Sequence, residues 1–319
     1  MAKYKIPEEG IYDARPLGKG RMFLLGFQHM FAMFGATVLV PILTGLDVST
    51  TLLFAGLGTL LFHLITGGKV PAFLGSSFAF LGGYAAIAPM LEDGSPNFEM
   101  LPYACFGVLC AGLMYVVLAA LFKAFGASKV MRFFPPIVTG PIIIAIGLNL
   151  SSSAINNCTG NWWVAIVAIA IIVACNIWGK GMVKIIPILL GVIGSYIFAV
   201  IIDPSVRANV AQNVHDAEWL ALPIHMEHTV IGLFMRDNLD GHLLLTSVVT
   251  IVPLSLATMV EHIGDVSAIS STCNRNYIEN PGLHRTLMGD GLATTLAALF
   301  GAPANTTYGE NTGVLALSR

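Results

Sequence analysis

Long apolar stretches follow one another along almost the whole chain, with short polar segments between them. A run of about 20 apolar residues is long enough to cross a bilayer as a helix. The pattern predicts an all-α polytopic membrane protein with about ten spans. They are expected at about 22–44, 50–66, 72–91, 101–125, 135–152, 161–178, 183–202, 243–265, 283–301 and 304 to the end. The ninth span is short and contains a charged residue, Asp290.

The third and tenth spans are interrupted by polar segments that contain Gly and Pro. In the tenth, the run 305–308 favours extended structure, and Gly309 and Glu310 follow it. The segment 71–78 in the third span has the same layout. Irregular backbone persists at membrane depth only where protein buries it or where it lines a polar cavity. We therefore expect short broken-helix or strand segments in these two spans, at a functional site.

Two short matches indicate an internal repeat. Pro71–Ala72 matches Pro303–Ala304, and Gln28–His29 matches Glu261–His262 at nearly the same separation. Seven predicted spans separate the second pair, and an odd number makes the second repeat inverted relative to the first. Inverted repeats with broken helices are typical of secondary transporters. The first repeat would hold seven spans and the second only three, so the chain is expected to be cut off inside its tenth helix, with helices 11–14 missing.

Composition and charge support the membrane assignment. The chain is 55% hydrophobic and 11% charged, whereas soluble domains carry about 25% charged residues. With the N-terminus inside, the predicted topology places every Lys and Arg except Arg207 and Arg236 on the inner side, as the positive-inside rule requires. We predict a multi-pass protein of the cytoplasmic (inner) cell membrane with a cytoplasmic N-terminus. The net charge of -2 gives no sign of a nucleic-acid partner.

Carboxylates at membrane depth are the first candidates for chemistry, because an intramembrane ionisable residue is by default a functional-site hypothesis. Glu310 could accept N–H groups from a planar heterocycle or carry a proton; the alternative is that it caps its own broken helix. Glu261 and Asp265 share one helix face, and two carboxylates so close favour the retention of one proton. This pair is a candidate proton carrier, unless Asp265 is solvated at the cytoplasmic interface.

His29 and His262 occupy matching places in the two repeats. Each is equally well interpreted as a buried neutral histidine satisfied by a neighbour or as part of a proton path. A metal site is not expected, because Glu261-His262 followed by Asp265 is not the His-Glu-x-x-His pattern of zinc ligands.

The opposite side of the predicted site offers donors and aromatic rings. The backbone N–H groups of Ser77 and Phe78 open a helix and can donate to a ligand carbonyl. The repeat aligns Phe78 with Glu310. Phe78 and Tyr308 are candidates to stack on an aromatic ring, although ordinary apolar packing explains them equally well. Acceptors on one side and donors on the other suit a small, uncharged, planar ligand such as uracil.

Two other classes of protein, an intramembrane enzyme and a channel, fit the residues less well. An intramembrane enzyme needs a nucleophile–base pair or a metal constellation, and no catalytic residues can be assembled from this sequence. A channel needs polar stripes on several helices, whereas these spans are mostly apolar. A transporter that uses protons and no other cofactor is the leading hypothesis.

Several motifs carry a resemblance to a known family. The segments 27–41, 74–80, 261–264, 281–285 and 305–311 resemble the nucleobase–ascorbate transporter family of proton-coupled nucleobase:cation symporters, which includes bacterial uracil permeases. The resemblance implies fourteen helices in a seven-plus-seven inverted repeat, with a core domain that holds the substrate and a gate domain that rocks against it. The expected divisions are a cytoplasmic N-terminal segment 1–21, core 22–132, gate 133–202, extracellular loop 203–242 and core 243–319.

The resemblance also implies roles for residues. Glu261 and Glu310 would bind uracil, the backbone of Phe78 and Gly309 would assist, and Ala36 would lie near the ring. One departure concerns Asp265, because one well-known type of uracil permease has a histidine there and purine-transporting relatives have Asp. Proton-coupled import of xanthine or uric acid therefore remains an alternative to uracil import. The protein is also expected to form a homodimer.

Overall fold

The computed structural model describes residues 18–130, 158–180, 187–216 and 222–318, with a few isolated positions outside these ranges. The side chains of Gln28, Ala36 and Glu310 lie outside the described part, although their backbone is helical. The predicted N-terminal segment and the fifth predicted span, 135–152, fall almost wholly outside it as well.

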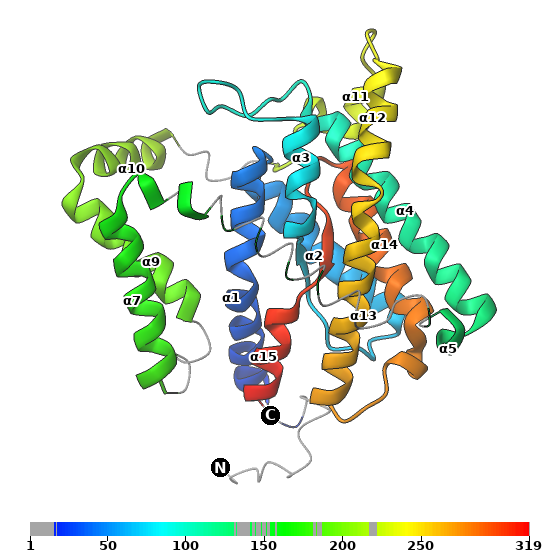
Figure 1. Ribbon diagram of the computed structural model, residues 1–319. Coiled ribbons are helices and arrows are strands. Elements are labelled where there is room, and N and C mark those ends of the chain that lie inside the picture. Colours follow the sequence, from blue (N-terminus) through cyan, green and yellow to red (C-terminus); the bar gives the residue numbers. More distant parts are fainter. Residues whose placement is uncertain are drawn as a thin grey trace. The chain divides into compact units, whose positions relative to one another are not determined.

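The described chain is mostly helical (Figure 1) and forms two compact units. The first unit takes in Met1–Gly35, Gly147–Leu222 and Leu317–Arg319, and the second takes in Ala36–Ile146 and Pro223–Ala316. Helix α1 (Lys19–Thr44) contributes residues to both units. The assignment of core and gate domains stays a prediction.

The long helices of the second unit follow the predicted spans closely. They are α2 (Val48–Thr66), α4 (Leu101–Phe125), α12 (Gly241–Ile251), α13 (Leu254–Thr272) and α14 (Leu283–Leu299). Local sequence sets the ends of α2: the Asp47 side chain accepts a hydrogen bond from Thr50 N at its start, and Gly67 adopts a left-handed conformation at its end. Short elements complete the unit: η2 (Phe78–Phe80), α3 (Leu81–Ile87), α5 (Ala127–Val130), η4 (Met226–His228), α11 (Val230–Phe234), η5 (Ile278–Gly282) and most of α15 (Gly309–Ser318).

Several described helices can cross a membrane. Val48–Thr66, Leu101–Phe125 and the combined helix Gly241–Thr272 are long and apolar enough, and the count rises to 4 if a bent pair is one span. That pair, Leu190–Ile202 with Pro204–His215, is bent by 111°. The combined helix is longer than the predicted span 243–265 because it continues well beyond Asp265.

Helix α14 is the central helix of the second unit, although its sequence is the least apolar of the long segments. It packs along both α4 and α2, and Asp290 is fully buried within it. Small residues allow the close approach: a Cβ on Gly291 would lie 2.6 Å from the carbonyl oxygen of Gly112 in α4. Glycine contacts of this kind are typical of packed membrane helices.

Two short strands interrupt the helical pattern where the sequence predicts extended segments. β1 (Leu74–Ser76) pairs with β2 (Asn305–Thr307) in an antiparallel sheet, with Gly75 opposite Thr306. All the residues of both strands are buried. The pairing satisfies backbone N–H and C=O groups that would otherwise be exposed to hydrocarbon.

The first unit is described by α7 (Trp162–Trp178), α9 (Pro187–Ile202) and α10 (Pro204–Asp216), together with the first part of α1. Helices α7 and α9 pack closely because Gly191 and Gly194 of α9 face the isoleucines 171 and 172 of α7. The predicted loop 203–242 contains regular structure, namely α10, η4 and α11.

Candidate functional site

The site is built around the crossing of β1 and β2. Ser77 N donates a hydrogen bond to Ala304 O at 3.0 Å, and Tyr308 N donates to Phe73 O at 3.0 Å, so the pairing extends beyond both strands. A helix begins directly after each strand, η2 at Phe78 and α15 at Gly309. Each crossing segment therefore presents the N–H groups of a helix start, which favour an acceptor or an anion.

These helix starts correct the repeat alignment. The match of Pro71–Ala72 with Pro303–Ala304 aligns Phe78 with Glu310. In the structure Phe78 and Gly309 occupy the same position relative to their strands, one residue away from that alignment. The dipeptide match misses this shift because Phe73 separates Pro71–Ala72 from β1, whereas β2 begins directly after Pro303–Ala304.

A threonine on a neighbouring helix holds the first residue of each strand. The Thr59 hydroxyl on α2 accepts a hydrogen bond from Leu74 N at 3.0 Å and lies 3.3 Å from Leu74 O. The Thr294 hydroxyl on α14 donates to Asn305 O at 2.9 Å. Because both threonines are buried, each hydroxyl replaces water as a partner for strand backbone. Sequence reasoning missed these two residues, since threonines are common in apolar helices.

A chain of polar side chains runs along one side of β2. His262 Nδ1 lies 2.9 Å from Asp290 Oδ2, and both side chains have 0% exposure. The same nitrogen lies 3.2 Å from Thr307 Oγ1, which donates to Asp265 Oδ2 at 3.2 Å. Two acids, a histidine and a hydroxyl from α13, α14 and β2 thus form one connected group. Such a group can hold and pass a proton.

For Asp290 the sequence leaves open a pairing with a helix end or a place at the inner exit. A charged residue in the middle of an apolar span is costly unless it is paired, so its presence indicated a partner elsewhere in the fold. The structure identifies that partner as His262 of α13. This contact offsets the cost of burying the Asp290 carboxyl group at the centre of the unit.

Asp265 lies against the start of α15 and is half-buried. A Cβ on Gly309 would lie 3.2 Å from Asp265 Oδ1, so the absence of a side chain at Gly309 permits this approach. The partial positive charge of the N-terminus of α15 favours a carboxylate there. The geometry therefore does not favour the alternative of a solvated, isolated Asp265.

The remaining predicted residues are distributed as follows. Ser77 and Tyr308 are buried beside the crossing, and the Tyr308 ring lies close to Gly75. Phe78 is half-buried at the start of η2, and Glu261 is half-buried on α13. The second unit thus brings Ser77, Phe78, Tyr308, Gly309, His262 and Asp265 to one crossing.

Three predicted site residues are less fully described. Glu310 follows Gly309 in α15 and Ala36 lies in α1, but their side chains are outside the described part of the chain. His29 belongs to the first unit, so its predicted link to the crossing stays a prediction.

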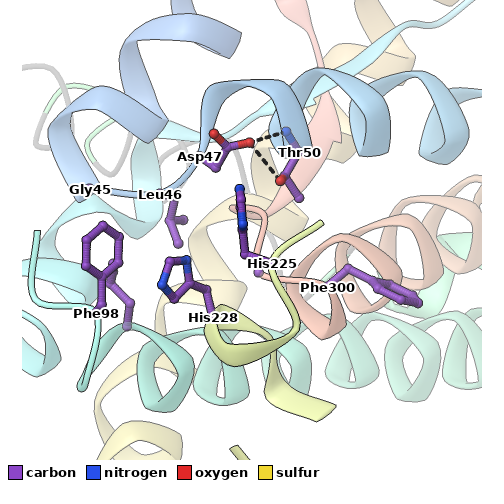
Figure 2. A pocket seen from close by; sticks show the side chains of 10 residues that line it. Gly45, Leu46, Asp47, Thr50, Phe98, His225, His228 and Phe300 are labelled. Atoms are coloured by element: carbon purple, nitrogen blue, oxygen red, sulfur yellow. Dashed lines mark hydrogen bonds between the residues drawn. The ribbon is translucent and has the colours of Figure 1, made fainter. Parts of the chain in front are cut away.

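A separate small pocket lies away from the crossing, between the loop before α2, residues 98–101 and the segment 225–228. Figure 2 shows His225 and His228 beside Asp47 and Phe98. The His228 ring stacks on Phe98 with centroids 4.3 Å apart, and burial lowers the pKa of this imidazole. The volume of this pocket is about 10 Å³, which has room for one water molecule only. The pocket therefore cannot accept a planar ring.

No group of three or more His, Cys, Asp or Glu side chains capable of holding a metal ion occurs among the described residues. At the crossing, His262 pairs with Asp290, and Asp265 accepts a hydrogen bond from Thr307. Two interrupted apolar segments that meet beside such a group are typical of membrane transporters built from repeats.

Comparison with known proteins gives the family. The profile of the Permease family (Xan_ur_permease) matches residues 20–319, and the chain belongs to this family. It is therefore a polytopic membrane permease and not an enzyme, and the resemblance seen in the sequence motifs is confirmed at the level of the family.

The similar proteins include several with curated names. The chain is 40% identical over 311 residues to "Uracil permease" of Bacillus caldolyticus, which covers 94% of this chain and 67% of that protein. It is 39% identical to "Uracil permease" of Bacillus subtilis, with 92% and 66% covered, and 34% identical to "Putative pyrimidine permease RutG" of Escherichia coli, with 93% and 64% covered. The chain spans about two thirds of the length of these relatives.

Proposed function

We propose that this chain forms the substrate-binding part of a proton-coupled symporter that imports uracil across the cytoplasmic membrane. The observation that carries the proposal is the antiparallel pairing of β1 with β2. It brings the helix start at Phe78 and the helix start at Gly309 to one place, beside Asp265. The names of the similar uracil permeases support the choice of substrate.

In this proposal the two sides of the crossing have different tasks. Glu261 and Glu310 accept the ring N–H groups of uracil, and backbone N–H groups at Phe78 and Gly309 donate to its carbonyl oxygens. Tyr308 and Phe78 supply the apolar surface for the ring, with Ser77 and Ala36 nearby. A pyrimidine has both kinds of group in one plane, so it satisfies donors and acceptors together.

We assign the transported proton to the ionisable side chains of α13. Glu261, Asp265 and His262 are the candidates, with His29 as a further member. Because Asp265 connects through Thr307 to the buried pair His262–Asp290, a proton gained at the crossing changes the charge of the whole group. Coupling then follows if the site changes access only when both proton and uracil are bound.

A purine such as xanthine or uric acid is the second candidate substrate. Asp265 favours a purine substrate, because the sequence resemblance associates Asp at this position with purine transport. The rest of the site does not separate the two classes of ring. Alternating access by rocking of a core domain against a gate domain, a cytoplasmic N-terminus and a homodimer belong to the same proposal.

The test is uptake of labelled uracil by cells that lack their own uracil transport and express the full gene. We expect accumulation that a protonophore abolishes and that excess unlabelled uracil suppresses more strongly than xanthine or uric acid does. Accumulation unaffected by the protonophore would contradict proton coupling. Stronger suppression by a purine would establish the second candidate substrate instead.

A further inference from the structure

A polar pocket lies at the end of the second unit where α13 ends and α14 begins. It has a volume of about 650 Å³ and opens to the surface. Figure 1 shows α5, the end of α13 and the start of α14 gathered at this end of the unit. Its lining residues are Lys69, Arg275, Asn276, Tyr277, Glu279 and Asn280.

The two basic residues of this pocket lie just past the ends of apolar helices. Lys69 follows α2, which ends at Thr66, and Arg275 follows α13, which ends at Thr272. Both helices belong to segments that are long and apolar enough to cross a membrane. The end of such a segment marks the edge of the hydrocarbon layer, where the phosphates of phospholipids lie. We therefore expect the pocket to lie at the depth of lipid headgroups.

Two of the three charged side chains that line the pocket, those of Lys69 and Arg275, are basic. Lys69 Nζ donates to Asn280 Oδ1 at 2.8 Å, which holds the ammonium group at the pocket. The Glu279 carboxylate, the one acid among the lining residues, accepts a hydrogen bond from Asn276 Nδ2 at 3.2 Å.

We propose that this pocket binds the phosphate headgroup of an anionic phospholipid. Arg275 offers a planar fork of donors that matches two phosphate oxygens, and Lys69 adds a second positive charge. The amide groups of Asn276 and Asn280 supply further donors. Basic pockets at the ends of membrane helices are suited to such headgroups. This site is distinct from the strand crossing and does not depend on which substrate is carried.

The experiment measures lipid binding to the purified full-length protein by native mass spectrometry, with defined lipids added to the detergent. We expect phosphatidylglycerol to bind more tightly than phosphatidylcholine. Lys69→Gln and Arg275→Gln should each weaken phosphatidylglycerol binding about fivefold, and the double variant about 25-fold. Glu279→Gln should strengthen it by a similar factor, because it removes the opposing charge.

Lys123→Gln is the matched control, since it removes an exposed basic charge at the same end of the unit but outside the pocket lining. It should change phosphatidylglycerol binding by less than about twofold. Equal binding of the two lipids, or equal losses in Lys123→Gln and Arg275→Gln, would overturn the proposal. Inorganic phosphate that occupies the pocket alone and displaces the lipid at equal concentration would overturn the assignment to a lipid headgroup.

Discussion

The two crossing segments of the second unit have the same construction and different chemistry. Each strand begins at a residue held by a buried threonine, Thr59 for β1 and Thr294 for β2, and each leads directly into a helix. One turn before these threonines the two halves diverge: Ala55 is buried in α2, whereas Asp290 is buried in α14.

This difference indicates how two similar segments form one site. Their shared construction sets the geometry, because segments that pair as strands bring their helix starts together. The chemistry comes from positions where the two segments are unequal. The connected group of His262, Asp265, Thr307 and Asp290 lies on the β2 side, and the β1 side contributes backbone and aromatic surface. Each prediction below changes one side of this comparison.

The largest effect on stability is expected from the buried pair. Asp290→Ala leaves His262 at 0% exposure without its carboxylate partner, and it should lower the free energy of unfolding by about 3 kcal/mol. Asp290→Asn keeps an oxygen that can accept from His262, so it should cost about 1 kcal/mol. Thermal unfolding of the purified protein in detergent measures both.

Asp93→Ala is the control for this prediction, because Asp93 is exposed and its carboxylate accepts hydrogen bonds from Ser95 in its own loop. It should change stability by less than about 0.5 kcal/mol. If Asp290→Ala unfolds at the same temperature as this control, the pair does not stabilise the β2 side.

The second prediction concerns the acceptor at the start of α15. Glu310→Gln should weaken uracil binding by at least about 100-fold, because an amide loses the charge of the carboxylate and the charge-assisted hydrogen bond to a ring N–H group. Glu99→Gln, at an exposed position, is the matched control and should bind normally. Titration calorimetry with uracil provides the measurement, and a loss of only a few-fold would remove Glu310 from the site.

The threonines give the most direct comparison of the two halves. Thr59→Val leaves the buried N–H of Leu74 without its acceptor and should cost about 2 kcal/mol. Thr294→Val removes a donor from Asn305 O and should cost about 1 kcal/mol. Serine at either position should restore most of the loss. Equal unfolding temperatures for wild type and both valine variants would show that the hydroxyls do not hold the strands.

The smallest effect on binding is expected from a substitution in the proposed proton path. Asp265→Asn should shift the pH dependence of uracil uptake while it weakens binding less than about tenfold, because it removes a titrating group but keeps an acceptor for Thr307. Asp237→Asn, an exposed acid, controls for general charge effects. Parallel measurements of uptake and binding across pH separate the two effects. An unchanged pH profile would move the proton to His262 or His29.

The sequence by itself determined the class of protein and the place of the unusual segments. Apolar runs of membrane length predict helices because hydrocarbon forces backbone groups to bond within the segment. The same requirement makes the polar stretches at 71–78 and 303–313 stand out, and both contain a buried strand in the structure. Motif resemblance then identified the family, which the comparisons confirm.

Only the tertiary structure decided which distant side chains meet. His262 and Asp290 lie on different helices, and their 2.9 Å contact depends on how α13 packs beside α14. The roles of Thr59 and Thr294 also depend on packing, because a hydroxyl in an apolar helix gives no sign of the backbone it will contact. Periodicity and motifs report local preferences along one chain. Strand register, helix crossings and buried pairs arise from the mutual fit of segments that are far apart in sequence, which local patterns do not encode.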